Sequence, residues 1–131
     1  MFDEADLIHS YTRAEALADG VLIDVTETAR EVGFRIPVAL TSTVWSDCVA
    51  WTDEDSARVV YQDEAGRLWD VLWMALVAAR RQPEASRLTY EMLRVQRDDT
   101  SPKPTKVRLV LDIGPGDNAE AVITIGFAED F

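Results

Sequence analysis

Hydrophobic residues recur with a helical period along one long segment in the middle of the chain. Between about Glu64 and Arg81 they fall in two adjacent stripes, one of Leu68, Leu72, Ala75, Leu76 and Ala79, the other of Trp69, Trp73 and Val77. Asp63 precedes the segment as an N-cap candidate, and basic residues end it, where cations favour the helix dipole. Two adjacent stripes predict a central helix that is buried on more than one side.

After Arg87 the apolar period changes from helical to two, which is typical of strands with one buried face. Three such segments follow, with inward positions at Leu88, Tyr90 and Met92, then Val107, Leu109, Leu111 and Ile113, then Ala121, Ile123, Ile125 and Phe127. A change of phase at Leu93 predicts a bulge. We expect an antiparallel three-stranded meander packed on the central helix.

The first 60 residues predict shorter elements. Thr12 and Glu15 form a capping-box pattern for a helix that ends before Gly20, and a strand and a second short helix follow, ending at Gly33. Pro37 interrupts the next extended segment, 34–40, which favours an edge strand or an irregular extension over a central strand.

A third helix is expected from about Thr41 to Trp51, followed by a turn with an acidic tip at 53–55. The 131 residues fit one domain, and no repeat or linker divides them. The sequence therefore predicts a single α+β domain spanning residues 1–131, with short helices and strands before the central helix and the meander.

Charge is distributed unevenly along the chain. Residues 1–65 hold 14 acids and four arginines (4 − 14 = −10), whereas residues 66–131 hold nine bases and ten acids (9 − 10 = −1). Within the second half, residues 80–108 carry eight bases and four acids, a local +4. Excess acid is one means of keeping a protein soluble, and it also suits a basic protein surface. It disfavours direct nucleic-acid binding, which needs a basic working face.

The residue inventory limits the chemistry. The chain has one cysteine, Cys48, and one histidine, His9, so we predict neither a disulfide nor a zinc site, and no metal or cofactor. Gly114-Pro115-Gly116 lacks the remaining residues of a phosphate-binding loop and predicts a hairpin turn. An enzymatic activity is left open, without a motif that supports it.

The chain start is acidic where a signal peptide is basic and then apolar, and the longest apolar run, Val71 to Ala79, has nine residues. A bilayer requires about 20. We expect a cytoplasmic protein without a membrane anchor.

Three segments resemble a family of uncharacterised small acidic proteins encoded on bacterial plasmids, integrative elements and prophages. They are SYTRAEALADGVLIDV from Ser10 to Val25, YQDEAGRLWDVLWM from Tyr61 to Met74, and GPGDNAE from Gly114 to Glu120. The resemblance spans nearly the whole chain and implies a mobile-element accessory protein. It implies no catalytic residues.

The resemblance to mobile-element proteins and the acidic first half of the chain together favour a non-enzymatic inhibitor. Its target would be a host defence system that acts on nucleic acid, so the protein would be an anti-CRISPR or anti-restriction protein. It would bind a basic protein surface, on a nuclease or an RNA-guided complex, through Asp3, Glu4, Asp6, Asp53, Glu54, Asp55, Asp63 and Glu64. The alternative is a small enzyme or ligand-binding module with a pocket between the central helix and the sheet, lined by His9, Asp24 or Tyr11. A homodimeric accessory protein is a third interpretation.

Overall fold

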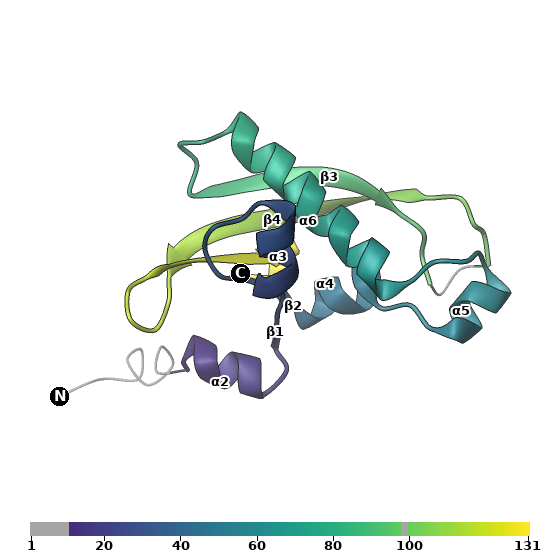
Figure 1. Cartoon of the computed structure of the whole chain (residues 1–131), viewed down its shortest axis with the longest axis horizontal. Helices are drawn as coiled ribbons and strands as arrows, with labels where there is room; N and C mark the ends of the chain where they lie inside the picture. Colours follow the sequence, from purple (N-terminus) through teal and green to yellow (C-terminus); the bar gives the residue numbers. More distant parts are fainter. Residues whose placement is uncertain (1–10, 98–99) are drawn as a thin grey trace.

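A five-stranded mixed sheet forms the framework of the protein (Figure 1). The computed structural model describes residues 11–97 and 100–131. The strands lie in the order β1-β2-β5-β4-β3, and their bounds are β1 Leu22–Asp24, β2 Val38–Thr41, β3 Arg87–Arg94, β4 Thr105–Pro115 and β5 Ala121–Gly126. Neighbouring strands are antiparallel except for β2 and β5, which are parallel.

The helices are short apart from one. They are α2 Arg13–Ala18, α3 Thr26–Val32, α4 Ser42–Val44, the π-helix η1 Trp45–Val49, α5 Asp53–Arg58, α6 Glu64–Arg81 and the 3₁₀-helix η2 Ala128–Asp130. Figure 1 shows α6 lying across the sheet with α3 beside it, and α2 and α5 at opposite ends of the molecule. No helix within residues 11–97 and 100–131 is long and apolar enough to cross a membrane.

The central helix is confirmed, with the bounds that the sequence predicted. Asp63 caps it, because its Oδ1 accepts from the Gly66 amide at 2.7 Å. Only one of the two apolar stripes is buried, however. Leu72 is fully buried, whereas Trp69 and Trp73 are 40% and 44% exposed. The expectation of burial on more than one side is wrong for the stripe of Trp69 and Trp73, which is exposed although β3, α3 and η1 all contact the helix.

The α+β class is also confirmed, but the sheet is larger than the predicted meander. Strands β3, β4 and β5 follow one another antiparallel, and β2 then adds to β5 in parallel, with β1 at the far edge. The register between β3 and β4 is unbroken from Arg87 to Arg94, so the predicted bulge at Leu93 is absent. Leu93 instead points its side chain to solvent.

Segment 34–40 does not form an edge strand, which corrects the interpretation of Pro37. Strand β2 begins at Val38, directly after the proline, and lies between β1 and β5. The Pro37 carbonyl accepts from the Ile123 amide at 2.8 Å. A proline at the entrance of a strand removes no ladder hydrogen bond, so it is compatible with an interior strand.

The helix expected through Trp51 ends at Val49 and contains a π-helical turn, η1. The segment expected as an acidic turn is helix α5 instead. Thr52 and Asp55 form its capping box: the Thr52 side chain accepts from the Asp55 amide, and the Asp55 carboxylate accepts from the Thr52 amide. A capping box satisfies two amides at a helix start, which explains why three consecutive acids begin a helix here.

Helix α2 is held at its start by the turn between β4 and β5. The Asp117 carboxylate accepts from the amides of Arg13 at 2.8 Å and Ala14 at 3.0 Å. The Arg13 guanidinium in turn donates to the Thr124 hydroxyl and the Ile123 carbonyl of β5. These contacts join residues more than 100 positions apart, and the predicted Thr12 cap is present as well.

Candidate functional site

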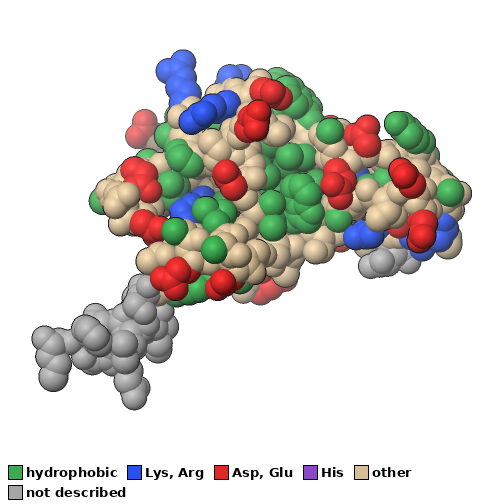
Figure 2. Space-filling model, turned by 60° about the horizontal axis from the view of Figure 1, so that its bottom comes forward, with side chains coloured by type: hydrophobic (Ala, Val, Ile, Leu, Met, Phe, Trp, Pro, Cys, Tyr) green, Lys and Arg blue, Asp and Glu red, His purple; other side chains and the backbone are tan. Residues whose placement is uncertain are grey.

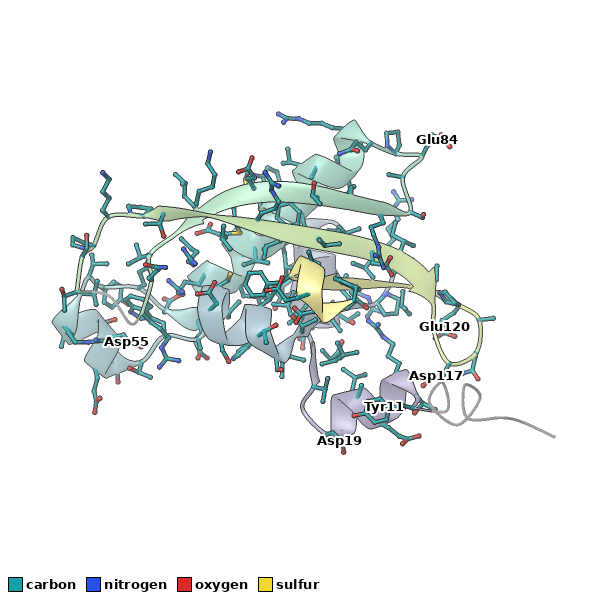
Figure 3. The ribbon with its side chains drawn as sticks, turned by 180° about the vertical axis from the view of Figure 1, so that it is seen from behind. Tyr11, Asp19, Asp55, Glu84, Asp117 and Glu120 are labelled. Atoms are coloured by element: carbon teal, nitrogen blue, oxygen red, sulfur yellow. The ribbon has the colours of Figure 1, made fainter. Side chains whose placement is uncertain are left out.

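The acidic residues predicted to bind a partner do not form one surface. Asp53, Glu54, Asp63 and Glu64 are exposed and stand at the starts of α5 and α6. Figure 2 shows acidic side chains spread over one face of the molecule, with hydrophobic side chains between them. In Figure 3, Asp55 lies at the opposite end of the molecule from Asp117 and Glu120. Asp3, Glu4 and Asp6 lie outside the described residues, as does His9.

Asp55 is not presented to a partner, because it is buried, with 5% of its surface exposed. Its carboxylate accepts from the Thr52 amide, pairs with the Arg58 guanidinium at 2.7 Å and lies 3.3 Å from that of Arg97. The hydrogen bond from the Thr52 backbone, followed by that from Arg58, lowers the pKa of Asp55 to about 2. The charge of Asp55 therefore stabilises the fold around α5.

This lowered pKa predicts an acid-sensitive contribution to stability. The pKa of Asp55 is lower in the folded chain than its ordinary value of 3.8, so the contribution is present above about pH 4 and is lost as the pH falls toward about 2. We expect the free energy of unfolding to fall more steeply across this window in the wild type than in Asp55→Asn. Urea denaturation at several pH values measures both slopes. Equal slopes would contradict the assignment.

Arg67 is the buried residue that sequence reasoning missed. It projects from α6, is 5% exposed, and lies over the Trp51 ring at 4.5 Å from the centroid. Its guanidinium donates to the carbonyls of Val49 at 3.1 Å, Asp47 at 3.2 Å and Val95 at 2.9 Å. Arg67 therefore supplies hydrogen-bond donors both to backbone carbonyls of η1 and to the carbonyl of the residue that directly follows β3. An arginine among the polar positions of a helical pattern gives no signal of such a role.

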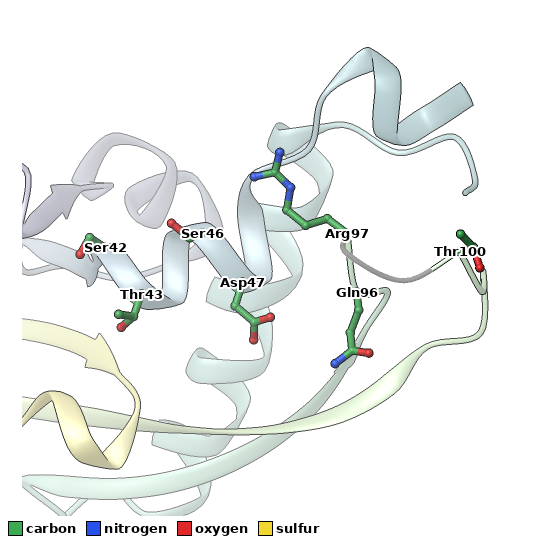
Figure 4. Close-up of a pocket in the computed structure, with 7 residues that line it drawn as sticks. All are labelled: Ser42, Thr43, Ser46, Asp47, Gln96, Arg97 and Thr100. Atoms are coloured by element: carbon green, nitrogen blue, oxygen red, sulfur yellow. The ribbon is translucent and has the colours of Figure 1, made fainter. Parts of the chain in front are cut away.

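A polar hollow of about 650 Å³ lies between α4, η1 and the segment that follows β3 (Figure 4). Its walls carry hydroxyls, one amide, one carboxylate and one guanidinium, from Ser42, Thr43, Ser46, Thr100, Gln96, Asp47 and Arg97. Arg94 holds the Asp47 carboxylate at 3.0 Å, and Arg97 is directed toward Asp55. Both charged groups are thus paired with neighbours in the fold.

Cys48 is next to the hollow residue Asp47 in sequence, but its thiol is buried and protonated at neutral pH. The thiol is 1% exposed, and burial raises its pKa to about 12, with the neighbouring Asp47 carboxylate adding to the effect. Since the thiolate is the reactive form, Cys48 acts as a small core residue, as its place on an apolar helix face predicted.

An apolar groove runs between α6 and the edge strand β3. It contains a hollow of about 390 Å³ lined by Trp73, Met74, Met92 and Leu93 together with Asp70, Glu91 and Lys106. Two smaller hollows adjoin it and share Asp70 with it, and the farther one reaches Tyr61, Asp63 and Gly66. We call these three hollows together the α6–β3 groove. Tyr61 is 79% exposed and Leu93 is 61% exposed, so its rim offers large side chains to solvent.

Asp70 lies where the three hollows of the groove meet. No hydrogen bond or ion pair joins its carboxylate to any residue within 11–97 and 100–131. Partial burial raises its pKa. By contrast, Glu91 is 3.7 Å from the Lys106 ammonium. The groove therefore combines exposed apolar surface with one carboxylate that forms no ion pair with a described residue, and the Arg67 guanidinium, which lines the two smaller hollows, acts to lower its pKa.

The pocket predicted between the central helix and the sheet corresponds in place to this groove, but its expected lining residues lie elsewhere. Asp24 faces a separate hollow of about 370 Å³ that includes Arg13, Asp117 and Glu120. Tyr11 donates its hydroxyl to Asp19 at 2.8 Å on the surface. Figure 3 labels both residues beside α2. Among the described residues, no group of three or more His, Cys, Asp or Glu side chains is placed to hold a metal ion.

Comparison with known proteins gives one match. Residues 1–131 match DUF6573, described as a family of unknown function. No curated protein and no solved structure matches the chain.

Proposed function

This chain belongs to the DUF6573 family, whose function is unknown, and from its surface we propose that it is a non-enzymatic protein-binding factor. The observation that carries the proposal is the α6–β3 groove, where Trp73, Met74 and Leu93 are exposed around the unpaired Asp70 carboxylate. Aromatic and methionine side chains are enriched at protein interfaces, and a few such anchors supply most of the binding energy. In a chain of this size, exposed tryptophan beside exposed leucine favours a binding surface.

The charge of the chain specifies the class of partner. Even without the first ten residues, positions 11–65 hold 11 acids and four arginines (4 − 11 = −7). Asp53, Glu54, Asp63 and Glu64 contribute to this charge and are exposed, and Asp63 lies on the rim of the groove. A field of this sign speeds the approach of a basic protein, while the apolar groove supplies affinity after contact. The partner is therefore a protein with a basic surface.

Basic surfaces are typical of proteins that hold nucleic acid. Together with the resemblance to proteins of plasmids, integrative elements and prophages, this supports a role as an inhibitor of a host nucleic-acid-targeting defence. The inhibitor would occupy or cover the basic surface of a nuclease or an RNA-guided complex. Asp55 is excluded from the contact set because it is buried in ion pairs, and the groove residues replace it.

A transformation assay tests this function. The chain is expressed in one host with an active restriction system and in another with an active RNA-guided system, each challenged with a plasmid that the system cleaves. We expect transformation in at least one host to rise toward that of a strain lacking the system. Trp73→Ala/Leu93→Ala should remove the effect, and Val21→Ala, which alters another exposed apolar residue, should keep it. Transformation equal to the empty vector in both hosts would contradict the proposal.

The polar hollow supports a second candidate function, the binding of a small polar molecule. Four hydroxyl side chains, an amide and two charged groups line one space of about 650 Å³. Ligand sites of this size use a few convergent polar groups for orientation, although most have a more apolar lining. The two functions separate cleanly, because substitutions in the groove leave the hollow intact.

A further inference from the structure

Strand β3 is the edge of the sheet, and its outer backbone groups make no hydrogen bond to another described strand. Their direction follows from one contact: the Ile113 amide of β4 donates to the Ser86 carbonyl at 2.7 Å. In an antiparallel ladder the N–H and C=O of one residue point to the same side, and the side alternates along the strand. The backbone groups of Arg87, Thr89, Glu91 and Leu93 therefore point away from β4.

The groove lies directly beside these groups. Its main hollow is lined by Met92 from the face of β3 that packs on α6, and by Glu91 and Leu93 from the opposite face. A hollow that contacts both faces of one strand must lie at the open edge of that strand. Helix α6 forms the other wall, through Asp70, Trp73 and Met74.

We propose that the α6–β3 groove binds an extended segment of a partner protein, which adds to β3 as a sixth strand and carries alternating apolar and basic side chains. This deepens the proposed function and rests on it for the claim that the groove contacts a protein. An edge strand supplies hydrogen bonds to any extended backbone, and the adjoining hollows select every second side chain. Here the side chains on the α6 side of the added strand meet Trp73 and Met74, and those on the opposite side lie beside Glu91 and Leu93.

The charge of the protein surface beside the added strand indicates that its second set of side chains is basic. On the side of β3 that faces away from α6, the Glu91 side chain is 47% exposed, and its carboxylate lies 3.7 Å from the Lys106 ammonium. An incoming lysine or arginine opposite Glu91 would gain a charge-assisted cross-strand pair on that side. Antiparallel pairing of β3 with β3 of a second copy, centred on Glu91, would set the two Glu91 carboxylates opposite each other, which disfavours a second copy in that register.

Fluorescence anisotropy with labelled peptides tests the proposal without knowledge of the natural partner. The probe is an acetylated peptide of alternating valine and lysine, about as long as β3. Two matched controls are the same peptide with a central proline, which cannot pair as a strand, and a valine–glutamate peptide of reversed charge. We expect the valine–lysine peptide to bind at least roughly tenfold more tightly than either control.

Two protein variants isolate the strand edge. Leu93→Ala and Leu93→Pro both remove the leucine side chain, but only proline removes an outward N–H, and an outward position on an edge strand tolerates it. We expect Leu93→Pro to bind the valine–lysine peptide roughly fivefold more weakly than Leu93→Ala. Circular dichroism confirms that both variants are folded.

Equal binding of all three peptides, or equal binding by the two variants, would overturn the strand-addition proposal. A dimer in sedimentation that Leu93→Pro disrupts and Leu93→Ala retains would also overturn it, by making a second copy the occupant. These failures differ from failure of the proposed function. If peptide binding fails while protection in the transformation assay still depends on Trp73 and Leu93, the groove binds its partner in another manner.

Discussion

Arg67→Met should lower the free energy of unfolding by about 3–5 kcal/mol, the largest single effect that we expect on stability. The substitution keeps much of the volume of the side chain and removes all of its donors. The carbonyls of Val49, Asp47 and Val95 then lose their partner in a buried site. Each buried acceptor left without a donor costs about 1–3 kcal/mol. Guanidinium denaturation monitored by tryptophan fluorescence measures the change.

Two further variants distinguish the hydrogen bonds of Arg67 from a general effect of removing a positive charge on stability. Arg80→Met alters an exposed arginine on the same helix and should change stability by no more than about 0.5 kcal/mol. Arg67→Lys keeps the charge but should not restore stability, because an ammonium cannot direct donors to several fixed carbonyls in the plane of a guanidinium. A loss below about 1 kcal/mol for Arg67→Met would show that the contacts of its guanidinium contribute little.

The sequence predicted the elements that depend on local pattern. The bounds of α6, its Asp63 cap, the Thr12 cap of α2 and the alternation in β3 are all set by residues within a few positions of one another. Helical and strand periods and N-cap chemistry act over that range, so they can be read from a single chain. The α+β class followed from these elements.

Features that depend on distant pairing were missed. The parallel contact of β2 with β5 joins residues such as Val38 and Ile123, and no local pattern encodes it. The prediction of an edge strand at Pro37 was wrong because the proline lies just before β2 and not inside it. A proline in that position removes no hydrogen bond between strands. The exposure of Trp73 was missed for a related reason: periodicity locates an apolar face but not what covers it.

The candidate site was predicted least well, because it is made by tertiary contacts. Asp55 looked like part of an acidic tip, and only the fold brings Arg97 to within 3.3 Å of it. The groove combines α6 with a strand edge, and neither segment alone indicates a binding surface. The acids Asp53, Glu54, Asp63 and Glu64 are exposed, and their role in attracting a basic partner stays a prediction.

Trp73→Ala/Leu93→Ala should abolish partner binding, the second large effect that we expect. Truncating one hot-spot residue typically costs about 2 kcal/mol or more, a factor of roughly 30, and the two side chains stand on opposite walls of the groove. The loss should be in affinity and not in folding, because both side chains are substantially exposed. Denaturation curves that match the wild type would establish this.

The most direct test of the groove as a binding surface is quantitative affinity capture from the host with three tagged forms of the chain, followed by mass spectrometry. We expect the wild type and Val21→Ala to recover the same basic protein of a nucleic-acid-targeting system, and Trp73→Ala/Leu93→Ala to recover roughly 30-fold less of it or none. Equal recovery of that protein by all three folded forms would contradict the account.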